Sequence, residues 1–174
     1  TNILIHIINV LLFYALLLLM FEKFKSAYKD YAILIAALVF AVHPIHTEVV
    51  AWVSGRTDGL FCTFFFAAFL YYLKYSKEPS NRNLIFTLVY YLFSLFSKEM
   101  AITLPAVIIL YDMIINRNVF KELLKKRMVM YGSLIVLSGL FMLLRWYALR
   151  EVIPRETYFY FYGRDTITAI LTML

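Results

Sequence analysis

One short stretch of this sequence, residues 43–48, places three ionisable side chains within six positions. It reads His43-Pro44-Ile45-His46-Thr47-Glu48. Imidazole and carboxylate groups can transfer protons, and two histidines three residues apart can share a helical face and bind a metal. The spacing matches no zinc signature, so a divalent metal stays open without support and we predict no metal site. Two interpretations remain: these side chains line a substrate site, or Pro44 begins a short interfacial helix whose histidines bond to backbone.

Three cations elsewhere in the chain have the chemistry to bind a phosphate. Arg56 follows Gly55, Lys98 lies between two apolar runs, and Arg145 lies near the end of another run. Arginine and lysine bind phosphate oxygens through charge-assisted hydrogen bonds. Alternatively, each can extend to the lipid headgroups, and Lys98 can pair with a carboxylate or a carbonyl.

Two acidic residues are expected to support these cations. Asp58 either forms a turn or pairs with Arg56. As a single helix, residues 84–115 would extend about 48 Å, which exceeds the thickness of a bilayer core, so the chain must bend near Lys98. We expect Ser97 to cap the helix after the bend and Glu99 to lie in its first turn.

The elements that position these groups are hydrophobic helices. Of the 174 residues, 63% are hydrophobic and 16% are charged, which leaves too little polar surface for a soluble fold and too little charge for a disordered chain. Backbone groups in lipid must be satisfied within their own segment, so each apolar run is expected to be a helix. The runs are 3–21, 31–42 (extending at most to 53), 60–75, 84–96, 100–115, 128–144 and a seventh from about 166. We therefore predict an all-α, polytopic transmembrane bundle of about six to seven helices.

Polar residues of the first run share one helical face. Asn2, His6 and Asn9 are spaced by four and three residues, which places them in one stripe. Asp112 lies toward the opposite end of its run from the motifs and is expected to be structural.

The basic residues are concentrated in three of the loops. The segments 22–30, 74–83 and 116–127 carry 11 of the 17 lysines and arginines. Alternating helices put these loops on one side, which the positive-inside rule assigns to the cytoplasm. The motifs then face the periplasm, the cell exterior or an organelle lumen. The net charge of +6 follows from this topology, and we expect no nucleic-acid partner.

The motifs, taken together and in order, resemble those of one family. Residues 40–48, Gly55-Arg56, Ser97-Lys98-Glu99 and Tyr111-Asp112 resemble the transmembrane and tetratricopeptide-repeat (TMTC) proteins, whose eukaryotic members are O-mannosyltransferases with a C-type (GT-C) glycosyltransferase fold. The resemblance covers roughly residues 1–147 and includes the polar stripe. No tetratricopeptide signature is present. Met100-Ala101 replaces a frequent Gln-Gly pair, and the resemblance to the eukaryotic pattern ends after Arg145, which indicates a prokaryotic relative.

The resemblance implies a membrane enzyme that transfers a sugar from a polyprenyl-phosphate carrier to a hydroxyl of a protein or glycan acceptor on the outer or lumenal face. The resemblance also implies that His43, His46 and Glu48 line the site. Arg56 and Lys98 would contact the carrier phosphate or support the loop. Arg145 is added on electrostatic grounds alone.

The resemblance also implies that residues 1–174 are a partial transmembrane domain. A first helix and an outer loop that carries the acidic catalytic base are expected ahead of Thr1, and further helices and repeats after Leu174.

Two other function classes stay open. Ionisable residues inside a membrane also form ion pathways, so the chain could be half of a transporter or channel. It could also be a scaffold subunit without catalytic activity. A transporter requires a polar path through both leaflets, and a scaffold would leave the outer charges paired with each other.

Overall fold

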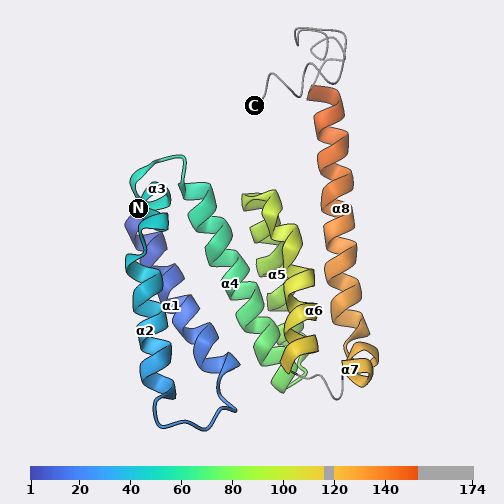
Figure 1. Ribbon diagram of the computed structural model, residues 1–174. Coiled ribbons are helices and arrows are strands. Elements are labelled where there is room, and N and C mark those ends of the chain that lie inside the picture. The colour runs from blue at the N-terminus through green and yellow to red at the C-terminus, as the bar shows by residue number, and fades with distance from the viewer. Residues whose placement is uncertain (116–119, 153–174) are drawn as a thin grey trace, which may run out of the picture. The chain divides into compact units, whose positions relative to one another are not determined.

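A computed structural model describes residues 1–115 and 120–152, and Figure 1 shows how the helices follow one another. The elements are α1 (Asn2–Met20), α2 (Lys29–Val42), the 3-10 helix η1 (Pro44–His46), α3 (Thr47–Ala51), α4 (Arg56–Lys77), α5 (Asn81–Ser97), the 3-10 helix η2 (Glu99–Thr103), α6 (Leu104–Ile115), α7 (Phe120–Lys126) and α8 (Met128–Val152). In these ranges every regular element is a helix and there is no strand. The predicted all-α class is confirmed, while the seventh apolar run, from about 166, lies outside the described residues.

The chain divides into two compact units, Thr1–Ser138 and Gly139–Leu174. The second unit contains the C-terminal part of α8, with Arg145 on it. All packing described below belongs to the first unit.

Three of the described helices are long and apolar enough to cross a membrane. They are α1, α4 and the Met128–Leu149 part of α8. The bent pair formed by α2 with η1 and α3, at 44°, makes a fourth if it is counted as one span. Helices α5 and α6 have 17 and 12 residues, so the expectation that several runs fall short of about 20 residues is confirmed. Large apolar side chains on α1 and α2 are exposed, as expected for a membrane protein whose outer surface meets lipid.

Helix α4 lies between α1 and α5 in the first unit (Figure 1). Small side chains at Ala67 and Ala68 are buried on it, which lets neighbouring helices approach closely. The fully buried apolar residues include Leu73, Leu95, Leu104, Ile108 and Leu134. These side chains form the apolar core between the helices.

The first unit has two ends of different chemistry. The N-terminus of α1, the η1–α3 segment, the start of α4 and the end of α5 lie together at what we call the motif end (Figure 1). The ends of α1, α4 and α6 and the start of α8 lie at the opposite, basic end. Lys23, Lys77 and Arg127 come from the three basic loops and line one cavity there.

Candidate functional site

The first histidine of the motif caps a short helix. Helix α2 ends at Val42, His43 is extended, and Pro44 begins η1. The backbone N–H of Ile45 donates to Nδ1 of His43 at 3.2 Å. Proline at the first position and this side-chain acceptor explain why the helix starts here. The predicted short helix at Pro44 is confirmed, while the role of His43 in lining a substrate site stays a prediction.

The second histidine packs within a group of rings. The ring centroid of His46 lies 4.5 Å from that of Phe40, 5.2 Å from His6 and 6.3 Å from His43. His46 is half-buried, and its ring nitrogens have no hydrogen-bond partner among the described residues. Over that same part of the chain, no three His, Cys, Asp or Glu side chains are placed to hold a metal ion.

The polar stripe of α1 binds backbone carbonyl groups of other helices. The Asn2 amide donates to the carbonyl oxygen of Trp52 at 2.7 Å, and Nε2 of His6 lies 2.9 Å from that of Ala41. The buried Asn9 donates to the carbonyl of Gly59 at 3.0 Å. The first two carbonyls lie at the ends of α3 and α2, where helical partners are missing. The three side chains thus share a face, as expected, and hold α1 against the ends of α2 and α3 and the first turn of α4.

A close backbone approach sets the start of α4. A Cβ atom at Gly55 would lie 2.7 Å from Cα of Val49, so only glycine fits between α3 and α4. A small pocket between α1 and α4 opens at this point and is lined by Asn2, His6, Asn9, Gly55 and Arg56, among others. Arg56 is exposed, and its guanidinium has no hydrogen bond or ion pair with the residues that the structure describes. It is an available cation.

Lys98 forms an ion pair with Asp58, across the ends of α5 and α4. Their side chains are 34% and 37% exposed, so the pair is accessible from outside the bundle. The bend near Lys98 is confirmed, because α5 ends at Ser97 and η2 begins at Glu99. Two details were wrong. Asp58 pairs with Lys98 instead of Arg56, and the hydroxyl of Ser97 donates back to the carbonyl of Phe93 at 2.8 Å instead of capping the next helix.

The predicted site residues fall into two groups at the motif end. The first group lies along η1, α3 and the start of α4 and consists of His43, His46, Glu48 and Arg56. Glu48 is exposed and lines a shallow pocket. The Lys98–Asp58 pair lies on another face of α4, because residues two positions apart on a helix point in different directions. Glu99 is exposed in the first turn of η2. Arg145 belongs to the second unit, and its role as a phosphate ligand stays a prediction.

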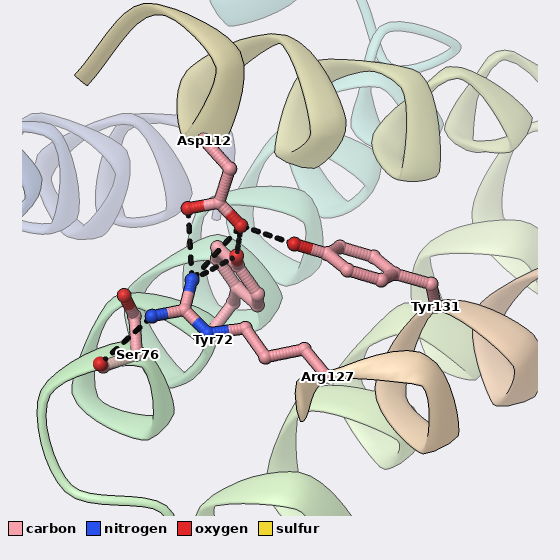
Figure 2. Close-up of polar contacts among 5 residues, drawn as sticks. All are labelled: Tyr72, Ser76, Asp112, Arg127 and Tyr131. Carbon is pink, nitrogen blue, oxygen red and sulfur yellow. Dashed lines mark hydrogen bonds and ion pairs between the residues drawn. The ribbon is translucent and has the colours of Figure 1, made fainter. Parts of the chain in front are cut away.

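A buried polar cluster lies toward the basic end of the first unit (Figure 2). Asp112 is fully buried and accepts hydrogen bonds from the hydroxyls of Tyr72 and Tyr131. Nη1 of Arg127 donates to both carboxylate oxygens at 2.9 Å, and Nη2 donates to the carbonyl oxygen of Ser76 at 3.0 Å. The expected structural role of Asp112 agrees with this geometry.

Arg127 and the two tyrosines were not identified from the sequence. Burial disfavours the charged form of Arg127, but Tyr72 and Asp112 outweigh it and raise the pKa of the guanidinium. Arg127 lies in a basic loop and the tyrosines lie in aromatic-rich runs, so nothing in the sequence distinguishes them from their neighbours. The one available signal was Asp112 itself, because a carboxylate in an apolar run is expected to pair with a cation.

Comparisons with known proteins identify relatives. The mouse (Mus musculus) protein O-mannosyl-transferase TMTC3 is 37% identical over 118 residues, which is 65% of this chain and 13% of that protein. Human TMTC3 is 38% identical over 119 residues, with the same coverage. Human protein O-mannosyl-transferase TMTC4 is 32% identical over 131 residues, which is 63% of this chain and 18% of that protein.

No protein-family model and no solved structure matches the chain. The chain spans 13% to 18% of the length of the relatives described above, and the expected prokaryotic origin stays a prediction. The family resemblance seen in the motifs is nevertheless confirmed by overall identity across about two thirds of the chain. The chain is therefore a relative of the TMTC protein O-mannosyl-transferases.

Proposed function

We propose that these residues are part of a membrane glycosyltransferase that moves a sugar from a polyprenyl-phosphate carrier to a hydroxyl of a protein acceptor. One observation carries the proposal: the relatives, at 32% to 38% identity, are named protein O-mannosyl-transferases. Mannose is accordingly the proposed sugar. Because the chain spans a small share of the length of those relatives, the proposal concerns a larger transmembrane domain, of the GT-C type, that contains residues 1–174.

The motif end supplies groups that suit this chemistry. When the bond between the sugar and the carrier breaks, negative charge develops on the leaving phosphate, and fixed cations in a water-poor site stabilise it. Arg56 is exposed and without a partner among the described residues, while Lys98 is accessible beside Asp58. His46 and Glu48 also lie at the motif end. The acceptor hydroxyl must also lose a proton, and the base proposed for that step is an acidic residue ahead of Thr1.

The proposed orientation follows from charge. The three basic loops supply the cations of the basic end, which the positive-inside rule places in the cytoplasm. The motif end then faces the periplasm, the cell exterior or a lumen, and transfer takes place on that side.

No observation favours the alternatives specifically. The pocket at the motif end and the cavity at the basic end share no lining residue, whereas a transporter needs a polar path that joins them. A scaffold is expected to pair its outer charges, but Arg56 and Glu48 have no ionic partner within the described ranges. The transferase is therefore the function that we propose.

The test is transfer of labelled mannose from a polyprenyl-phosphate carrier by the complete protein in membranes. Arg56→Gln and Lys98→Gln each remove one cation, and we expect the transfer rate to fall about 100-fold, the loss typical of one charge-stabilising group. Glu48→Ala should also lower transfer. Arg82→Gln is the matched control, because Arg82 is exposed at the opposite end of α5.

Two results would contradict different parts of the proposal. Full activity in both Lys98→Gln and Glu48→Ala would show that the site is assigned to the wrong residues. A wild-type protein that transfers no sugar from the carrier would contradict the function itself.

A further inference from the structure

The cavity at the basic end combines cations with an apolar wall. It measures about 380 Å³ and lies between the ends of α1, α4 and α6 and the residue Arg127. Its polar lining includes Lys23, Lys77 and Arg127, and its apolar lining includes Leu19, Phe24 and Ile115. We propose that this cavity binds the phosphate headgroup of an anionic phospholipid.

Not all of the positive charge at the cavity is neutralised by the protein. Arg127 is held by the buried Asp112, and Lys77 pairs with Glu22. Lys23 is exposed and forms no ion pair with any side chain in the described ranges. The Lys77–Glu22 pair is itself 35% and 60% exposed, so its attraction is weakened by solvent. Lys23 and Lys77 are thus accessible to an incoming anion, while Arg127 forms a fixed wall.

The apolar lining favours a lipid over a dissolved anion. Phe24 lines the cavity and is exposed, and the exposed Phe21 packs against it with ring centroids 5.4 Å apart. Acyl chains can cover both rings. Inorganic phosphate would leave this surface in contact with water, whereas a phospholipid covers it and places its phosphate among the lysines. Basic pockets between transmembrane helices are known to bind anionic headgroups in this way. The inference does not rest on the proposed function, because the cavity and the motif end share no lining residue.

The experiment measures lipid retention on the whole chain. Nanodiscs of phosphatidylcholine with a minor fraction of phosphatidylglycerol supply both lipids, and native mass spectrometry counts the bound molecules after extraction. We expect phosphatidylglycerol to be retained preferentially by the wild type, and Lys23→Gln to weaken that retention about fivefold, the effect of one cation at a charged lipid surface. Lys25→Gln is the matched control, because Lys25 is exposed in the same loop and does not line the cavity.

Each result decides the question. Loss in Lys23→Gln, retention in Lys25→Gln, and recovery in Lys23→Arg support the site. Equal retention of the two lipids by the wild type, or equal losses in the two glutamine variants, would overturn it. Inorganic phosphate that binds the chain in neutral detergent as tightly as phosphatidylglycerol would assign the cavity to a free anion and also overturn the lipid proposal. Thermal unfolding of Lys23→Gln at the wild-type temperature excludes misfolding as the cause of a loss.

Discussion

Asp112 and Arg127 depend on each other inside the bundle. The carboxylate accepts from Tyr72, Tyr131 and Arg127, and its removal leaves a buried guanidinium without its charge partner. We expect Asp112→Ala to lower the free energy of unfolding by roughly 3–5 kcal/mol, measured by denaturation in mixed detergent micelles. Tyr131→Phe removes one donor and should cost about 1.5–3 kcal/mol.

The pair can be replaced as a unit. Asp112→Leu combined with Arg127→Met should recover most of the lost stability, because neither charge then stays buried alone. An Asp112→Ala protein within 1 kcal/mol of the wild type would contradict the structural role of the cluster.

Lys98 and Asp58 differ from that cluster in exposure. Both side chains are about one third exposed, and ion pairs of this kind contribute about 0–1 kcal/mol. We therefore expect Lys98→Gln to change the unfolding free energy by less than about 1 kcal/mol while it lowers sugar transfer. Denaturation and transfer measured on the same preparation check this. A large loss of stability would show that Lys98 acts through folding.

The candidate site residues could be identified from the sequence, but the side chains that they contact could not. The types of His43, Arg56 and Lys98 and their place next to apolar runs identified them as unusual. The partner of Lys98 lies 40 positions away, and no local pattern distinguishes Asp58 from Glu99 as that partner.

At the scale of the helices, the contact between α3 and α4 depends on one glycine. Gly55→Ala places a Cβ atom 2.7 Å from Cα of Val49, and backbone atoms cannot move aside as a flexible side chain can. We expect a loss of about 1–3 kcal/mol, as for other overpacked sites, measured by thermal unfolding. Gly132→Ala is the control, since apart from the neighbouring backbone of its own helix nothing lies within 4 Å of its added Cβ. It should be neutral or stabilise α8 by up to about 1 kcal/mol. Equal effects of the two substitutions would contradict this packing.

Most helices follow from hydrophobic runs. The run 3–21 became α1 (Asn2–Met20), and the length of residues 84–115 required the break that separates α5 from α6. Cap residues were less predictable, because Ser97 had two acceptable hydrogen bonds and the choice between them depends on packing. Helix α7 does not correspond to any apolar run, so the hydrophobic pattern does not predict it.

For the whole molecule, the segregation of charge predicts which end is accessible from each side of the membrane. In a Cys62→Ala background, a cysteine at Ser54 lies at the motif end and one at Ser80 at the basic end, and both positions are exposed. An impermeant maleimide should label Ser54→Cys from the non-cytoplasmic side, and Ser80→Cys in sealed vesicles whose cytoplasmic face is outward. The reverse pattern would contradict the proposed orientation.

The hydrogen bonds of α1 also have a consequence for the order of synthesis. Asn2 and Asn9 bond to carbonyl groups 50 residues further along the chain, and His6 bonds to one 35 residues further. Helix α1 therefore leaves the ribosome before α2, α3 and α4, which carry the groups that satisfy it, and an unsatisfied polar group in hydrocarbon costs several kcal/mol. We therefore expect water or the insertion machinery to cover the polar face of α1 until α2, α3 and α4 have followed it.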